Sequence, residues 1–381
     1  MPLAQPRLNS KRQKLARKYA GLMKRLSFIE SAIVGVILVA LIFGGVFVKL
    51  SHYLPFAQPW ASAFYFVILA SGLGIILMPL SYYQGFVLPR RFGLSHQKLG
   101  AWLKDRAKAA ALGFVLGLAV IILVYWLVDH FPDTWWLWAG IFLFLLSLLL
   151  TGLAPTLLLP IFFKLEPLGD IKLKKRLMNL AKRAQVKVVN VFTMDLSSKG
   201  TTANAMLAGL GRTRRIILTD TLLQKYTSDE IEVILAHELG HHLHRDIPKL
   251  IALQAAVILL GLYLSNLVLK ASVVPFRFTG ISDVAAFPML LLSIAAFGII
   301  ITPLTNAYSR YVETAADKVA IELSANPQAF VAAMTRLTNQ NLSVANPSRQ
   351  QELLFYDHPS YTRRVSLANS YIGKGLKEAI N

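Results

Sequence analysis

The chain has 381 residues, 55% of them hydrophobic, and its 40 Lys and Arg against 20 Asp and Glu give a net charge of +20. Its mean hydropathy of +0.51 excludes an ordinary soluble domain, and its lack of cysteine excludes disulfides and thiolate metal sites. Because the basic residues cluster beside apolar runs, the charge predicts membrane orientation and contact with a lipid bilayer rather than a nucleic-acid partner.

Several apolar segments reach the roughly 17–25 residues that a bilayer core requires. We predict six membrane spans, and the fourth is long enough to bend at Pro155 or Pro160. The predicted spans are 29–50, 60–81, 108–129, 135–163, 250–270 and 287–306.

The loops between these spans alternate in basic charge. Segments 1–28 and 164–249 are rich in Lys and Arg, whereas 51–59 contains neither and 271–286 contains only Arg277. Because basic loops stay in the cytoplasm, both termini and the 164–249 segment are predicted to be cytoplasmic.

Segment 164–249 predicts a small α/β unit between spans four and five. Residues 171–185 are typical of a basic helix, and 187–195 are typical of a strand. Residues 204–209 and 214–220 flank a glycine-containing turn and predict a hairpin.

A helix that opens at a capping box on Thr227 carries the sequence HELGH. His237 and His241 are four residues apart, so they project from one helical face, where two neutral imidazoles can share one Zn²⁺. Glu238 can act as general base on a zinc-bound water. His242 points about 100° away from His241 and is expected to be a surface or packing residue.

The segment SRYVETAADKVA supplies a candidate third ligand. Glu313 would complete a His₂Glu site with an open fourth position, and Asp317 would accept the second N–H of a liganding histidine, most plausibly His237. Alternatively, both carboxylates form ordinary surface salt bridges with Arg310 or Lys318.

The combination of HELGH, SRYVETAAD, SSKGTTANAMLAGLGRTRRIILTDTLL and LLLPIFFKLEPLGD resembles the type I CAAX prenyl endoproteases. These are integral-membrane zinc metalloproteases, gluzincins of metallopeptidase family 48, and the chain looks like a prokaryotic member, which implies a prokaryotic cell membrane. The resemblance covers about Leu80 to Arg364. It implies one zinc on His237, His241 and Glu313, with Glu238 catalytic. At HPSYTRR the chain departs from the eukaryotic pattern.

The resemblance also implies substrate-binding residues. An edge strand that pairs with an extended peptide would be formed by Asn204, Ala205, Met206, Leu207 and Ala208. The resemblance places His358 and Arg364 at the site too, where they would stabilise an oxyanion. The alternatives are an ordinary hairpin strand, a helix cap at His358, and binding of Arg364 to an acidic surface or lipid phosphate.

The predicted spans also locate the zinc site. Span five begins about eight residues after His241, roughly 12 Å at helical rise, and Glu313 follows span six as closely. The metal should therefore lie at or just inside the cytoplasmic membrane face. We predict a mostly α-helical multi-pass membrane protein, with about six transmembrane helices and a small α/β zincin core containing a short β-sheet.

The expected activity is that of a zinc metalloendopeptidase acting on membrane-associated peptide or protein substrates, either prenylated, CAAX-like or misfolded. Rival hypotheses are a transporter, a noncatalytic metal-stabilised scaffold and a site-two-type intramembrane protease. The charged residues around HELGH argue against the last. The predicted regions are 1–163 with spans one to four, 164–249 with the zincin core, 250–306 with spans five and six, and 307–381 with the third ligand.

Overall fold

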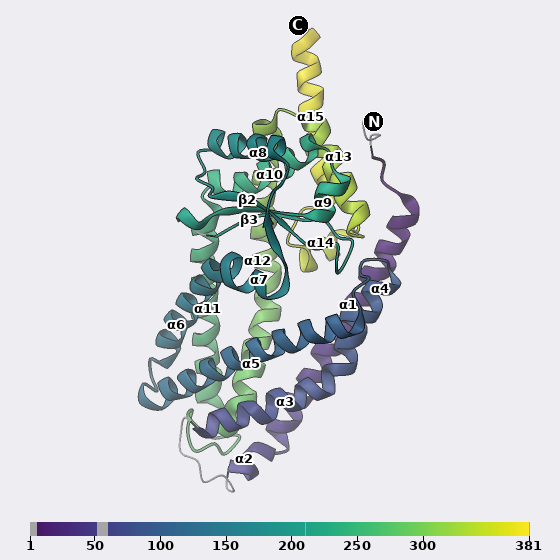
Figure 1. Ribbon diagram of the computed structural model, residues 1–381. Helices are drawn as coiled ribbons and strands as arrows, with labels where there is room; N and C mark the ends of the chain where they lie inside the picture. Colours follow the sequence, from purple (N-terminus) through teal and green to yellow (C-terminus); the bar gives the residue numbers. More distant parts are fainter. Residues whose placement is uncertain (1–5, 52–59, 210, 381) are drawn as a thin grey trace.

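The computed structural model describes residues 6–51, 60–209 and 211–380, so most of the predicted loop 51–59 lies outside the described residues. Figure 1 shows long helices at one end of the molecule and a small sheet covered by shorter helices at the other. The prediction of a mostly helical protein with a short β-sheet is confirmed.

Within the described residues, six helical segments are long and apolar enough to cross a membrane, as predicted. They are α1 (Ser10–Phe43); α3 (Trp60–Tyr82) with η1 (Tyr83–Val87) and α4 (Leu88–Arg91); α5 (Leu99–His130); α6 (Trp135–Leu153) with η2 (Ala154–Leu158) and α7 (Leu159–Phe162); α11 (Asp246–Ser272); and η4 (Val284–Ala286) with α12 (Phe287–Ser324). Large apolar side chains such as Ile75 and Ile299 are 73% and 71% exposed, as expected of lipid-facing surfaces.

The first and fourth spans differ in detail from the prediction. The first helix does not occupy 29–50: it begins at Ser10 and ends at Phe43. It ends there because Gly45 adopts a φ of +60°, a conformation that glycine tolerates, and a separate helix, α2 (Val46–Ser51), follows. The fourth span contains a π-helical turn that includes Pro155, one of the two positions at which a bend is predicted.

The sheet has four strands in the order β1-β2-β4-β3. They are β1 (Leu165–Pro167), β2 (Asn190–Met194), β3 (Ala205–Ala208) and β4 (Arg215–Thr219). β2 and β4 run parallel, whereas β1 and β3 pair antiparallel with their neighbours, so the predicted hairpin of β3 and β4 is confirmed. β3 therefore forms one edge of the sheet.

Helix α10 (Ser228–Leu243) lies at the centre of the zincin core. It packs against α12, α13 and the sheet, and its Leu235, Ala236 and Leu239 are fully buried. The surrounding elements are α8 (Ile171–Arg183), η3 (Gly211–Thr213), α9 (Asp220–Lys225), α13 (Pro327–Gln340), α14 (Arg349–Phe355) and α15 (Tyr361–Ile380).

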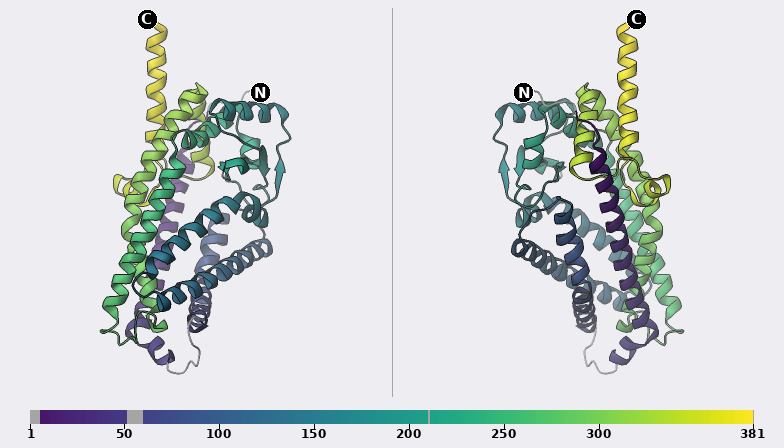
Figure 2. Two further views of the ribbon diagram at one scale, coloured as in Figure 1. Left: turned by 90° about the vertical axis from the view of Figure 1, so that its left-hand side faces the viewer. Right: turned by 90° about the vertical axis from the view of Figure 1, so that its right-hand side faces the viewer.

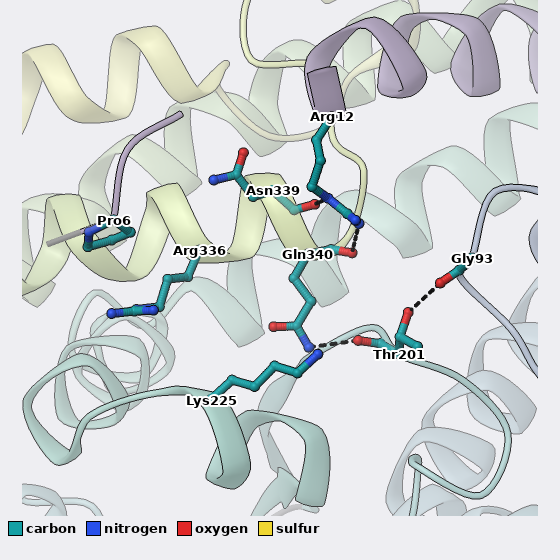
Figure 3. A pocket seen from close by; sticks show the side chains of 8 residues that line it. All are labelled: Pro6, Arg12, Gly93, Thr201, Lys225, Arg336, Asn339 and Gln340. Carbon is teal, nitrogen blue, oxygen red and sulfur yellow. Dashed lines mark hydrogen bonds between the residues drawn. The ribbon is translucent and has the colours of Figure 1, made fainter. Parts of the chain in front are cut away.

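The start of α1 is attached to this core. Arg12 donates hydrogen bonds to the carbonyl oxygens of Asn339 and Gln340 at the end of α13, and the Gln340 amide donates to the Thr201 carbonyl oxygen (Figure 3). Ala203 and Asn341 exchange two further bonds. These bonds join the first span to α13 and to the loop that precedes β3, and they fix the edge strand to the membrane helices.

Candidate active site

The N-terminus of α10 is fixed by the predicted capping box. The Thr227 hydroxyl accepts a hydrogen bond from the Glu230 N–H, and the Glu230 carboxylate accepts one from the Thr227 N–H. The other oxygen of Glu230 accepts from Arg336 of α13 at 2.7 Å. The start of the helix that bears the histidines is thus held to the rest of the core.

A glycine in the HELGH sequence sets the distance between α10 and α12. A Cβ atom at Gly240 would lie 3.1 Å from both Cα and the carbonyl oxygen of Ala316. The absent side chain lets α12 approach closely enough for Glu313 to reach the two histidines of α10.

His237, His241 and Glu313 form a cluster whose ligand atoms all lie within 4.8 Å of one another. Nε2 of His237 is 3.1 Å from Oε2 of Glu313, and Nε2 of His241 is 3.4 Å from Oε1. Ligands in a tetrahedral zinc site with bonds of about 2.0–2.1 Å lie roughly 3.3 Å apart, so the set has the dimensions of a zinc site.

The buried oxygen of Glu313 provides a second indication that the cluster suits a cation. Its Oε2 atom is buried and makes no well-formed hydrogen bond among the described residues, although Nε2 of His237 and Nε2 of His358 lie 3.1 and 3.4 Å from it. A buried carboxylate oxygen without a well-formed hydrogen bond is costly unless a cation binds it. Two imidazoles, one carboxylate and no thiolate form the donor set of a catalytic zinc site with an open fourth position.

Each histidine faces a carboxylate on its other side. Nδ1 of His237 lies 2.9 Å from Oδ1 of the fully buried Asp317, the residue that the sequence singled out. Nδ1 of His241 lies 3.4 Å from Oδ2 of Asp246, which is also buried. These carboxylates fix which ring nitrogen faces the cluster.

Asp246 was not predicted from the sequence as a partner of a histidine in the cluster. The requirement that each liganding histidine have its own outer partner could have revealed it. Arg245, with a φ of 54°, makes the turn that starts α11 and brings Asp246 back beside His241.

The pKa of His237 reflects these surroundings. Burial lowers it, but the carboxylates of Asp317 and Glu313 outweigh burial and raise the pKa to about 9. The two carboxylates therefore favour positive charge at His237.

Arg364 is held by an ion pair on the Nδ1 side of His237. Its Nε and Nη2 atoms donate to the two oxygens of Asp317 at 2.8 and 2.5 Å, and Nη2 is 3.4 Å from Nδ1 of His237. Burial lowers the pKa of Arg364, but the carboxylates of Asp317, Glu313 and Glu238 raise it above its usual value. The guanidinium is thus a permanent cation that holds Asp317.

His358 projects toward the cluster from the loop between α14 and α15. Its Nε2 atom is 3.4 Å from Oε2 of Glu313, and its Nδ1 atom is 2.9 Å from Oδ1 of Asp357. The bond to Asp357 raises the pKa of His358 above its usual value, against the lowering effect of burial. The structure therefore brings His358 and Arg364 to the cluster of His237, His241 and Glu313 from two different sides.

Two histidines that follow HELGH in the sequence, His242 and His244, lie outside the cluster. His242 contacts Arg214 at 3.3 Å, and His244 ends α10. Glu238 is partly buried on the helix that carries both histidine ligands.

A cavity of about 410 Å³ lies beside the cluster. Asn204, the residue before β3, lines it together with His358, Arg364, Met334 and Tyr361. The cavity therefore extends from the residue that precedes β3 to the loop that carries His358.

This fold and site define a multi-pass membrane metallopeptidase. Residues 3–164 match the model "CAAX prenyl protease N-terminal, five membrane helices", and residues 167–372 match peptidase family M48. Four of the six spans lie within the first match. The chain belongs to peptidase family M48, a family of zinc metallopeptidases, as the sequence indicated.

The chain is similar to proteins from bacteria and eukaryotes. It is 29% identical to an uncharacterized metalloprotease, YhfN, of Bacillus subtilis, over 93% of this chain and 84% of that protein. It is also 29% identical to CAAX prenyl protease 1 of Saccharomyces cerevisiae, over 83% of this chain and 74% of that protein. The crystal structure of S. mikatae Ste24p shares the fold, with a TM-score of 0.83, 24% identity and coverage of 96% and 92% of the two chains.

Proposed function

We propose that this M48 peptidase cleaves membrane-anchored proteins at the cytoplasmic face of a prokaryotic cell membrane. The supporting observation is the position of the cluster between two spans. His237 and His241 end a helix that is followed at once by span α11, and Glu313 lies on α12, which is itself the sixth span. A site held in this way suits substrates attached to the same bilayer.

Each residue of the site has a role in peptide hydrolysis. When bound to His237, His241 and Glu313, zinc would polarise the scissile carbonyl and lower the pKa of water to about 7. Glu238 removes the proton from the attacking water and delivers it to the leaving amine. The protonated ring of His358 donates a hydrogen bond to the developing oxyanion, where one such donor contributes roughly 2.7–4 kcal/mol.

Arg364 and Asp317 are positioning residues in this proposal. Arg364 fixes both oxygens of Asp317, and Asp317 holds His237 in the tautomer whose Nε2 faces the cluster. This role differs from direct stabilisation of the oxyanion by Arg364, and the two can be separated by measuring zinc affinity.

The edge strand β3 supports binding of an extended peptide. Among the described residues its outer edge has no partner strand. In the antiparallel pairing with β4, the Thr219 N–H bonds to the carbonyl oxygen of Asn204, so the main-chain groups of Ala205 and Leu207 should point to the free edge. A peptide added there passes the cavity beside His358.

The proposed orientation rests on charge and on the shared position of the two ends of the chain. The basic loops predict cytoplasmic termini. Figure 1 shows α15 and the start of α1 at the same end of the molecule as the sheet. The division at residues 163, 249 and 306 stays a prediction.

The activity is tested with purified protein in phospholipid nanodiscs and a proteome-derived peptide library, with and without a zinc chelator. The proposal predicts discrete internal cleavages that the chelator abolishes and zinc restores. Cleavage that persists in the chelator, or none with zinc present, would contradict it.

The substrate class is tested with one peptide sequence in three forms, which carry no lipid, a palmitoyl chain or a prenyl group. Faster cleavage of both lipidated forms supports membrane-anchored substrates in general. Faster cleavage of the prenylated form alone would narrow the class to that indicated by the name of the yeast relative. Equal rates for all three would refute a preference for anchored substrates.

A further inference from the structure

Helix α14 is polar at its start and apolar at its end. It opens with Arg349 and two glutamines, all exposed, and closes with Leu353, Leu354 and Phe355, which are 54%, 41% and 61% exposed. Three consecutive large apolar side chains are rarely left in water, so this end of the helix has the character of a contact surface.

This apolar end is continuous with the lipid-facing surface of the sixth span. The side-chain amide of Asn306 donates to the carbonyl oxygen of Leu354 at 3.1 Å, and Arg310 donates to that of Glu352 at 3.0 Å. About half a turn before Asn306 on α12, Leu304 is 66% exposed. In Figure 2 the segment that contains α14 projects sideways from α12. Figure 1 shows α14 near the height of α7, where the fourth span ends.

Basic side chains surround the same end of α14. Lys24 of α1 lies over the ring of Phe355, with Nζ 4.8 Å from the centroid, and over Tyr356 at 5.2 Å. Arg363 has a side chain that is 64% exposed. The acidic residue of α14, Glu352, is buried, so the exposed charge that α14 itself presents is positive.

We propose that α14 is an interfacial anchor, which inserts Leu353, Leu354 and Phe355 into the bilayer leaflet on the side of the zinc site. The neighbouring Lys24 and Arg363 bind the phosphates of anionic phospholipids. Apolar side chains in the acyl boundary, flanked by cations at the headgroups, are the pattern of peripheral membrane anchors.

The anchor also affects the position of the His358 loop at the active site, and this consequence rests on the proposed function. Only Tyr356 and Asp357 separate α14 from His358, and the buried Glu352 accepts the N–H of Ser360 at 3.1 Å. Seating α14 in the leaflet therefore holds the His358 loop at the bilayer surface, where an anchored substrate arrives.

Nitroxide labelling tests the insertion without any assay of activity. The full chain has no cysteine, so Leu354→Cys and its matched control Gln350→Cys each carry a single label in vesicles of phosphatidylcholine and phosphatidylglycerol. The label at position 354 is expected to collide preferentially with oxygen, and the label at 350 with a water-soluble nickel complex. Equal access of the nickel complex to both labels would overturn the proposal, and so would spin–spin broadening at 354, which would indicate a contact between two copies.

Two further measurements test separately the role of the basic residues and the link between α14 and His358. In phosphatidylcholine alone, the label at 354 should be shallower than with the anionic lipid, and an unchanged depth would refute the role of Lys24 and Arg363. Phe355→Ser should lower cleavage of a lipidated peptide several-fold while zinc content stays unchanged, with Gln350→Ser as control. A Phe355→Ser enzyme as active as the control would refute the link to His358, whatever the depth of the label.

Discussion

Replacing Arg364 with alanine separates the two roles that a basic residue can have at this site. The side chain of Arg364 is 15% exposed, and its guanidinium binds both oxygens of Asp317, whose side chain is 1% exposed. Removing one partner of a buried ion pair typically costs about 3–5 kcal/mol, because the remaining charge loses its partner. Arg364→Ala should therefore lower the free energy of unfolding by about 3 kcal/mol or more.

The same substitution should weaken zinc binding, because Asp317 would no longer be held against His237. Loss of such an outer contact typically lowers metal affinity by about 10–100-fold. The assay is competition with a chromophoric chelator in detergent, combined with denaturant unfolding. Arg363→Ala is the matched control for zinc affinity, since Arg363 is largely exposed and pairs with Glu352 at 3.4 Å rather than with Asp317. An Arg364→Ala protein with normal zinc affinity and stability but a low kcat would refute positioning and indicate direct action on the substrate.

Three further predictions follow from the geometry of the strand, the helix pair and the spans. Leu207→Pro removes an N–H that is expected at the free edge of β3, so it should raise KM by up to about tenfold relative to Leu207→Ala, with zinc content unchanged. An unchanged KM would indicate that β3 has only a structural role. Gly240→Ala should lower zinc affinity in chelator competition by separating α10 from α12, although alanine favours a helix by about 1 kcal/mol; normal affinity would show that the close approach is dispensable. In intact cells a cysteine at Ser282 should react with an impermeant maleimide and one at Ser348 should not, and the reverse pattern would invert the proposed orientation.

The predictable parts of this molecule are those with local signals. Apolar length predicted six spans, and the Thr227 capping box predicted the start of α10. The four-residue spacing placed His237 and His241 on one face, and the same spacing paired Glu313 with Asp317.

The remaining features depend on tertiary contacts that leave little trace in sequence. The apolar run 29–50 looked continuous, yet a left-handed glycine at position 45 divides it. Asp246 became a partner of His241 only through the turn at Arg245. The family resemblance predicted Arg364 at the site, but only the fold shows that its guanidinium binds Asp317.

The central claim is that Glu238 transfers protons while His237, His241 and Glu313 bind zinc. The most direct test is Glu238→Gln in nanodiscs, with zinc content and the turnover of one mapped peptide measured on the same sample. The variant should keep one zinc per chain and lose nearly all turnover, because the ligands remain and the base is gone. Cleavage by Glu238→Gln at the unmodified rate, with zinc bound, would contradict the mechanism.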